Sequence, residues 1–325
     1  MSARAALRVG TRGSALALWQ TERIRSLLAA SGHRTEPIEI RTTGDLVPDV
    51  PLARIGSVAL FTRQIDQAML DGRIDLGVHS LKDLPTEPPP GIVIAAISER
   101  EDPSDALVGR DAIRWGELPR SATVATSSLR RRAQLLHARP DLRVMEVRGN
   151  VDTRLRKLDG DQSWSAILLA TAGLLRLGLG HRIGERLSPE VMLPAPGQGA
   201  LAVTARADDT EAIAAARAAV HHEPSALEVS AERAFLRRLQ GGCQVPVAAR
   251  ATVESTGEGP TLRLQGRVIA LGGERVAQGL ERGPVRSLED AERAGLVLAE
   301  RLLVEGAAEI LSEVRADMAP VVPEP

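Results

Sequence analysis

The chain has 325 residues, 43% of them hydrophobic and 26% charged, and its 41 Lys and Arg residues against 42 Asp and Glu residues give a formal net charge of −1. This length predicts two or three domains, and the absence of a basic excess, with only two Phe, three Trp and no Tyr, argues against a nucleic-acid-binding protein. The single cysteine excludes an intramolecular disulfide and a multi-cysteine zinc site.

No stretch approaches 18 uninterrupted apolar residues, and the N-terminus lacks a long apolar segment followed by a small-residue cleavage site. We therefore expect a cytoplasmic protein that has no membrane or nucleic-acid partner. Nothing in the sequence is typical of an interface helix or a coiled coil, and the motif for a helical zinc site, HExxH, is absent, so no metal is expected.

Short apolar runs alternate with helical patterns over the first two hundred residues. Strands are expected at 7–12, 36–43, 73–80, 91–98, 106–110, 122–127, 142–149 and 165–171. Helices are expected at 14–32, 61–73, 128–141 and 150–160. This order predicts an α/β fold whose sheets are mainly parallel and covered by helices on both faces. Ligands of such sheets bind at the carboxyl ends of the strands.

Two segments have the composition of hinges between domains. Residues 99–105 are charged and contain Pro103, and residues 193–201 are rich in Pro and Gly. They indicate a second domain inserted into the first, with a cleft between the two lobes. Helices expected at 224–240 and 287–306 enclose strands at 245–254, 261–270 and 274–281, which predict a smaller α+β domain with a three-stranded antiparallel sheet. The expected division is domain 1 at 1–100 and 199–220, domain 2 at 101–198, domain 3 at 221–316, and a flexible tail at 317–325.

Three strand-to-helix junctions share a composition that suits anions. Each joins a helix N-terminus, which attracts anions, to hydroxyl or amide side chains and to arginine, which matches a carboxylate or phosphate. One such junction is more often an ordinary helix cap, but three together predict a cleft for a ligand with several negative groups. The junctions are Arg12, Gly13 and Ser14; Thr126, Ser127, Ser128, Arg130 and Arg131; and Arg148, Gly149, Asn150 and Arg154.

Two further features concern charge. Consecutive residues of a helix point in different directions, so we expect Arg132 to be the solvated member of its arginine run.

The stretch HSLKDLP places Ser80, Lys82 and Asp83 at the end of a strand. An ionised Asp83 is suited to accept hydrogen bonds from N–H donors and to stabilise a developing cation. A surface Lys–Asp pair before a proline turn is an equally compatible reading. His79 is expected to be a satisfied strand-end residue.

The only cysteine, Cys243, follows two glycines in LQGGCQVPV, a pattern that predicts an accessible loop. A lone cysteine is more often an inert buried residue. A cysteine hydrolase would need a histidine partner, and no histidine follows Cys243 in the chain, although an upstream one could approach it. The other alternative is a thiol that permanently anchors something bound in the anionic-ligand cleft.

Several motifs, in this order, resemble those of porphobilinogen deaminase, also called hydroxymethylbilane synthase, from about residue 7 to about residue 316. They are LRVGTRGSALALWQ, VHSLKDLPT, EREDPSDALV, TSSLRRRAQL, RGNVDTRLRKLD, AGLLRLGL, LPAPGQGAL and HHEPSALEVSAERAFLRRLQGGCQVP. The resemblance implies two periplasmic-binding-protein-like lobes and a monomeric transferase of haem and porphyrin biosynthesis. Such an enzyme condenses four porphobilinogen molecules head to tail with loss of ammonia, and water then releases the linear tetrapyrrole hydroxymethylbilane.

The resemblance also implies specific residue roles. A dipyrromethane cofactor, which carries four carboxylates, is attached through a thioether to Cys243. Asp83 matches the catalytic aspartate, which stabilises the azafulvene cation left when porphobilinogen loses ammonia and assists proton transfers. By motif position, the residues expected to bind cofactor and substrate are Arg12, Ser14, Ser80, Lys82, Thr126, Ser127, Ser128, Arg130, Arg131, Arg148, Gly149, Asn150, Arg154, Arg176, Gln198 and Gly199.

The chain departs from the family in the loop that covers the cleft. The family's Gly-Lys-Gly is replaced by Ser57, Val58 and Ala59, which removes one cation and two glycines, while Arg54 keeps the charge of a lysine. We expect weaker substrate binding with the chemistry retained, so an unchanged KM in Val58→Lys would contradict this expectation. The alternative hypothesis for the whole chain is a two-lobed small-anion-binding module without catalysis, which would not need Cys243.

Overall fold

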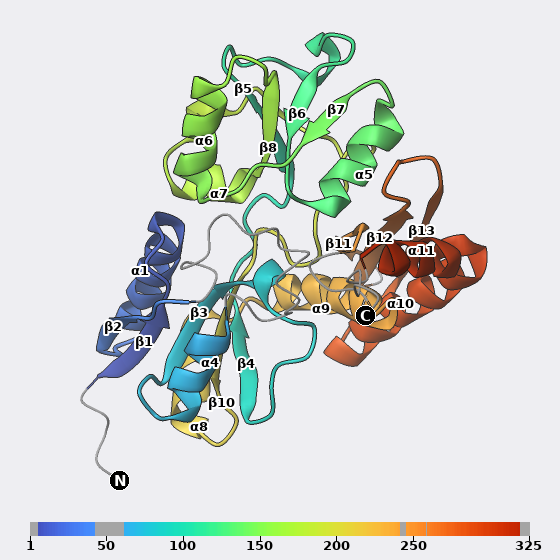
Figure 1. The fold of residues 1–325 in the computed structure, drawn as a ribbon. Coiled ribbons are helices and arrows are strands. Elements are labelled where there is room, and N and C mark those ends of the chain that lie inside the picture. The colour runs from blue at the N-terminus through green and yellow to red at the C-terminus, as the bar shows by residue number, and fades with distance from the viewer. Residues whose placement is uncertain (1–5, 43–61, 241–244, 258, 319–325) are drawn as a thin grey trace, which may run out of the picture.

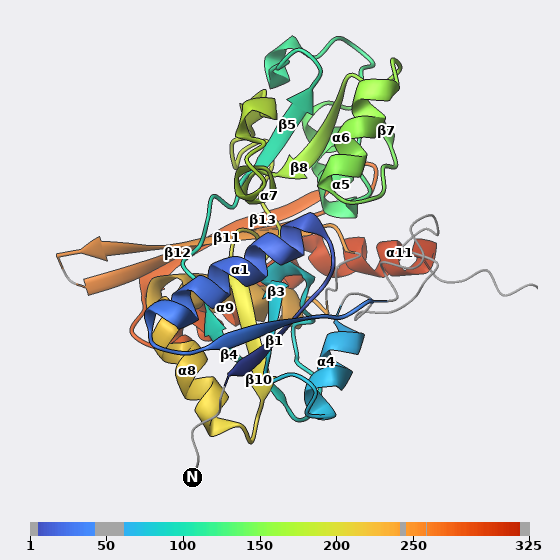
Figure 2. The same ribbon diagram turned by 90° about the vertical axis from the view of Figure 1, so that its left-hand side faces the viewer.

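The computed structural model describes residues 6–42, 62–240, 245–257 and 259–318. Its strands form three sheets, which belong to two α/β lobes and to a third, α+β part (Figure 1). In both views the third part lies at the height where the two lobes meet (Figure 2). Among the described residues, no helix is both long enough and apolar enough to cross a membrane.

The first lobe is built on a five-stranded sheet. Its strands are β1 (Leu7–Thr11), β2 (Thr35–Glu39), β3 (Leu76–Ser80), β4 (Ile92–Ile97) and β10 (Leu201–Arg206), in the order β2-β1-β3-β10-β4. Its helices are α1 (Ala15–Ala30), α4 (Arg63–Leu70), α8 (Thr210–Val220) and the 3-10 turn η1 (Leu81–Asp83). The helices α1 and α8 share one apolar cluster with the strands, in which Ile24 and Leu28 meet Val9 and Leu76. The helix α4 packs through a separate cluster around Ile65.

The second lobe repeats this plan. Its strands are β5 (Asp105–Gly109), β6 (Thr123–Ala125), β7 (Arg143–Met145), β8 (Ala166–Ala170) and β9 (Glu185–Arg186), in the order β7-β6-β8-β5-β9. Its helices are α5 (Leu129–Ala138), α6 (Val151–Gly160) and α7 (Thr171–Arg176), with the 3-10 turns η2 (Trp115–Glu117) and η3 (Gly180–Arg182). Apolar clusters line both faces of the sheet, so the expected helical cover on both sides is confirmed.

The expectation of mainly parallel sheets holds for most strands and fails for one strand in each lobe. The strand β10 pairs antiparallel with β3 and β4, and β5 pairs antiparallel with β8 and β9. Each reversed strand directly follows a segment that crosses between the lobes. Because the other strands end at the cleft and a crossing segment enters from the cleft, the next strand must run away from it.

The third part is a meander backed by helices. Its elements are α9 (Glu223–Arg238), β11 (Val247–Thr256), β12 (Gly259–Ile269), β13 (Val276–Pro284), α10 (Leu288–Leu302), the π-helical turn η4 (Leu303–Ala307) and α11 (Ala308–Met318). The strands pair antiparallel in the order β11-β12-β13, as predicted. The helix α11 includes residues 317 and 318, which were expected to belong to the flexible tail. Residues 319–325 lie outside the described residues.

Candidate active site

One buried side chain joins the two crossing segments to both lobes. Gln198, 1% exposed, donates from Nε2 to the carbonyl of Pro103 at 2.7 Å and to Oδ1 of Asp105 at 3.0 Å. Its Oε1 accepts a hydrogen bond from Nζ of Lys82 at 3.0 Å. An amide is suited to this position because it offers a donor to lobe 2 and an acceptor to lobe 1 at the same time.

Two arginines of α5 converge on Asp105, which is fully buried. Arg130 donates from Nη1 to Oδ2 at 2.7 Å, and Arg131 donates to Oδ1 from Nε at 3.0 Å and from Nη2 at 2.6 Å. Burial alone disfavours a charged carboxylate, but the two guanidinium groups outweigh it and hold the pKa of Asp105 well below its usual range. Two cations share one anion, so this buried group keeps a net positive charge.

The expected catalytic aspartate lies where cations from both lobes act on it. Asp83 is in the turn η1, which is held down by the fully buried Leu81. Burial lowers the pKa of Lys82 to about 8, and the negative charge of Asp83 opposes this shift. Burial and the charges of Arg131 and Arg148 lower the pKa of Arg154 to about 10, and Asp83 opposes that shift as well. Asp83 therefore lies within electrostatic range of Lys82 in lobe 1 and of Arg154 in lobe 2.

The three junctions differ in how their polar side chains are used. Ser14 caps α1 by accepting from the N–H of Ala17 at 3.3 Å, and Ser128 caps α5 by accepting from the N–H of Arg131 at 3.4 Å. These two hydroxyls serve as ordinary caps. At the third junction, the exposed Asn150 makes no side-chain capping hydrogen bond.

Hydroxyls next to the second junction are also engaged by the backbone. Thr126 accepts from the N–H of Ser128 at 3.2 Å, and Ser127 donates to the carbonyl of Val147. Arg132 is exposed, as predicted, whereas its neighbours in the run are buried. At the third junction, Arg154 donates from Nε to the carbonyl of Gly149 at 2.7 Å.

Arg176, the last residue of α7, reaches from lobe 2 to the crossing segment. Its Nη2 donates to the carbonyl of Gly199 at 2.5 Å, and its guanidinium lies 5.7 Å from the ring centre of Trp19 on α1. Burial lowers the pKa of Arg176 to about 10. Gly199 has a φ of +92°, and a Cβ there would lie 2.3 Å from the carbonyl oxygen of Glu101, so this position requires glycine.

The end of β3 is fixed by buried polar partners. Ser80 accepts a hydrogen bond at 2.8 Å from Nε2 of the buried Gln20 on α1. His79 lies 3.1 Å from Oγ1 of Thr204, which confirms it as a satisfied strand-end residue. Burial lowers the pKa of His79 to about 4, and the positive charge of Arg12 acts in the same direction. Arg12 is thereby placed near the same strand end as Ser80.

Sequence reasoning overlooked three charged residues at the centre of the molecule. Asp105 was only the last residue of a predicted hinge, and Arg100 and Glu232 were not singled out. Glu232, 0% exposed, accepts from Nη1 and Nη2 of Arg100 at 2.8 and 3.1 Å and from the N–H groups of Gly197 and Ala251 at 2.7 Å each. The one available signal was Asp105 itself, because a carboxylate that opens a buried strand requires a cationic partner.

Two predicted features fall on residues that the structure does not describe. Cys243 lies in 241–244, between the end of α9 and the start of β11, and the departing loop around Val58 lies in 43–61. The positions of these side chains are therefore not part of the geometry described above.

The described cleft residues suit a ligand with several carboxylates. Among the described cleft residues, Lys82, Arg130, Arg131, Arg154 and Arg176 outnumber the carboxylates Asp83 and Asp105, and burial, which disfavours the charged form, lowers the pKa values of Lys82, Arg154 and Arg176. A dipyrromethane with four carboxylates would supply the missing negative charge. The residues therefore fit this cofactor.

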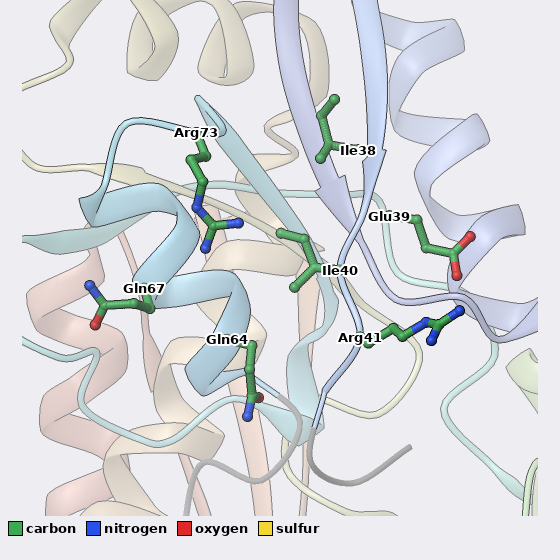
Figure 3. A pocket seen from close by; sticks show the side chains of 7 residues that line it. All are labelled: Ile38, Glu39, Ile40, Arg41, Gln64, Gln67 and Arg73. Atoms are coloured by element: carbon green, nitrogen blue, oxygen red, sulfur yellow. The ribbon is translucent and has the colours of Figure 1, made fainter. Parts of the chain in front are cut away.

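A separate hollow of about 350 Å³ lies between the end of β2 and α4 (Figure 3). Its lining residues are Ile38, Glu39, Ile40, Arg41, Gln64, Gln67 and Arg73. None of them belongs to the charged group in the cleft, and none was predicted to act in the reaction. We assign this hollow no part in the chemistry.

Two solved structures with low sequence identity match about two thirds of the chain. The methionine-binding protein MetQ matches with a TM-score of 0.42 and 15% identity over 66% of this chain and 89% of that chain. A periplasmic substrate-binding protein of an ABC transporter from Coxiella burnetii matches with a TM-score of 0.42 and 16% identity over 70% of this chain and 96% of that chain.

Proteins found by sequence comparison match the chain at much higher identity than these solved structures. The family model "Porphobilinogen deaminase, dipyromethane cofactor binding domain" matches residues 7–214, and "Porphobilinogen deaminase, C-terminal domain" matches residues 226–304. Curated proteins named porphobilinogen deaminase are 49% identical in Moorella thermoacetica, covering 95% of this chain and 97% of the relative, and 51% identical in Rubrobacter xylanophilus, covering 94% and 97%. These matches favour an enzyme over the binding-module alternative. The chain belongs to the porphobilinogen deaminase family.

Proposed function

We propose that the cleft between the two lobes is the active site of a hydroxymethylbilane synthase. Membership of the family makes the chain a transferase of tetrapyrrole biosynthesis that acts on porphobilinogen and carries a dipyrromethane cofactor. The observation that carries the site assignment is the group of Lys82, Gln198, Asp105, Arg130 and Arg131, which joins both lobes and keeps an excess of positive charge.

The cations bind and orient the carboxylates of cofactor and substrate. Arg154 and Lys82 do so from opposite lobes, so a ligand held by both also holds the lobes together. The pair formed by Arg130 and Arg131 acts mainly through its field, because several of its N–H groups already donate to Asp105 and to backbone carbonyls. In a site with few water molecules such a fixed charge is strong. Asn150, Arg148 and Arg12 add donors at the helix N-termini.

Asp83 is the catalytic residue in this proposal. When porphobilinogen loses ammonia, positive charge develops on the pyrrole, and a carboxylate that accepts hydrogen bonds from pyrrole N–H groups stabilises that charge. The turn η1 fixes Asp83 beside Lys82, which can donate to the departing amine or to a substrate carboxylate. When bound, the dipyrromethane would supply a nucleophilic free α-carbon for the methylene carbon that the loss of ammonia leaves on the substrate.

Cys243 is the proposed attachment point of the cofactor. Its support is its position in the family's motif and the absence of any other thiol in the chain. Intact-protein mass spectrometry of the purified chain is expected to show a mass increase of two pyrrole units that is absent in Cys243→Ser. An unmodified wild-type chain would contradict the proposed enzyme, and a modification that persists in Cys243→Ser would contradict the anchor.

We further propose that the chain works as a cytoplasmic monomer with domain divisions near residues 100, 198 and 220. The net charge of −1 supports the absence of a nucleic-acid partner. Light scattering coupled to size-exclusion chromatography tests the oligomeric state, and a mass of twice 34.6 kDa would contradict the monomer.

A further inference from the structure

The third part contacts the two lobes in different ways. Towards lobe 1, Ala226 and Val229 of α9 complete an apolar cluster with Leu81, Leu84 and Ile97. Towards lobe 2, the described hydrogen bonds come from β12, from the turn that follows it, and from β11, where the N–H of Ala249 donates to the carbonyl of Pro194 at 3.1 Å. Apolar burial is worth about 25 cal/mol per Å² and is hard to interrupt, whereas a few polar contacts can exchange with water. The position of the third part relative to lobe 2 can therefore change more easily than its position relative to lobe 1.

The polar joint rests on α5, the helix that carries the paired arginines. Arg267 of β12 donates from Nη1 to Oε1 of Gln134 at 3.0 Å and to the carbonyl of Glu190 at 3.2 Å. The ring Nδ1 of His137 lies 2.8 Å from the carbonyl oxygen of Gly273. Gly273 has a φ of +84°, and a Cβ there would lie 2.4 Å from the backbone nitrogen of His137, so the turn lies directly on the helix.

Gln134 carries this contact to the charged group in the cleft. It is buried, its Oε1 accepts from the N–H of Leu193 at 2.9 Å, and its Nε2 donates to the carbonyl of Leu193 at 3.0 Å. The same carbonyl accepts from Nη1 of Arg130 at 2.7 Å, and that nitrogen also donates to Asp105. An unbroken series of hydrogen bonds thus runs from Arg267 in the third part to Asp105 in lobe 2.

We infer that Arg267 is a positioning residue for Arg130. By holding the Gln134 amide, it fixes the Leu193 carbonyl on which Arg130 rests, and so sets the position of the cleft cations relative to the part of the chain that carries Cys243. This inference rests on the proposed function, in which Arg130 helps to bind carboxylates of a ligand anchored at Cys243.

The test compares Arg267→Met with Arg275→Met. Arg275 is a matched control, because it lies in the turn between β12 and β13 and forms an exposed ion pair with Glu313 inside the third part. In Arg267→Met, loss of the charge-assisted hydrogen bonds of Arg267, among them the one to Gln134, is expected to raise KM for porphobilinogen about fivefold with kcat nearly unchanged. Hydrogen exchange at the Leu193 N–H is expected to accelerate by about the same factor. Arg267→Lys is expected to recover part of both effects.

A second variant changes the hydrogen-bond partner of Arg267 inside the third part. Gln278 accepts from Nε of Arg267 at 3.0 Å, so Gln278→Met loosens Arg267 without altering α5 and is expected to shift KM and Leu193 exchange in the same direction, by less. Equal Leu193 exchange in Arg267→Met and Arg275→Met would overturn the inference, as would a raised KM without faster exchange. Failure of the proposed function is distinguishable, because the wild-type chain itself would then lack the dipyrromethane mass and any turnover.

Discussion

Two buried carboxylates organise the middle of the molecule, and they differ in how their charge is balanced. Glu232 meets one guanidinium, that of Arg100, and two backbone N–H groups, and Oε2 of Glu228 lies 3.5 Å from the same guanidinium, so no positive charge is left over there. Asp105 meets the two guanidinium groups of Arg130 and Arg131, so positive charge is left over. A buried group whose cations are matched by carboxylates needs no further anion, whereas a group with excess cations is stabilised by one. We therefore propose a structural role for Glu232 and a ligand-binding role for the group around Asp105.

Glu232→Gln is expected to have the largest effect on stability. It removes the carboxylate that accepts two hydrogen bonds from the buried Arg100, which keeps only the longer contact with Glu228 at 3.5 Å, and breaking a buried ion pair costs about 3–5 kcal/mol. Thermal unfolding should show a large fall in Tm, and an anion in the cleft should not reverse it, because Glu232 lies at the junction of the crossing segments with the third part. A Tm restored by the dipyrromethane-loaded state would show that Glu232 belongs to the binding site.

Asp105→Asn is the matching change at the unbalanced group. In the chain without cofactor, it leaves two buried cations sharing only an amide, at a cost of about 3 kcal/mol. In the cofactor-loaded chain, ligand carboxylates should offset part of this cost. The Tm difference between Asp105→Asn and wild type should therefore be smaller in the loaded state. An equal difference in both states would place Asp105 in the framework with Glu232.

The pH dependence of substrate binding sharpens the comparison at Lys82. Burial lowers the pKa of Lys82 to about 8 from an ordinary 10.5, so the cleft loses a positive charge as the pH rises through about 8. We expect KM for porphobilinogen to rise above that pH, and Lys82→Arg to flatten the rise because arginine stays charged.

The effect of rising pH on the folding stability has the opposite sign to its effect on substrate binding. Because the pKa of Lys82 is lower in the folded chain, the contribution of this group to stability increases between about pH 8 and pH 10.5. A KM for the wild type that stays constant from pH 7 to pH 9 would contradict the placement of Lys82 in the binding site.

The smallest effect is expected at Trp19, which is 39% exposed and lies against Arg176 across the lobes. A cation–π contact with a partly exposed ring is worth about 1 kcal/mol, so Trp19→Leu should lower the Tm by only a few degrees. The intrinsic fluorescence of Trp19, measured with Trp115→Phe and Trp164→Phe in place, should change when the cofactor is removed. An unchanged spectrum would show that this contact does not respond to the cleft.

Much of the local structure could be predicted from the sequence because its causes are local. Apolar periodicity located β1, α1 and the three-stranded meander, and Ser14 and Ser128 are the residues that open α1 and α5. The strand β10 and the helix α8 were not predicted. The strand at 201–206 directly follows the Pro- and Gly-rich crossing segment, whose composition is typical of a loop.

For the site, the sequence by itself determined which chemical groups are available: arginines and hydroxyls at strand ends, one aspartate in HSLKDLP and one thiol. Only the tertiary structure decided how they are paired. Gln198 meets Lys82 across 116 positions of the chain, and Glu232 meets Arg100 across 132. No local pattern encodes such pairs, because each depends on where a crossing segment enters a sheet. Two buried carboxylates therefore came to lie in different surroundings, Glu232 in a group without excess positive charge and Asp105 in a group with it.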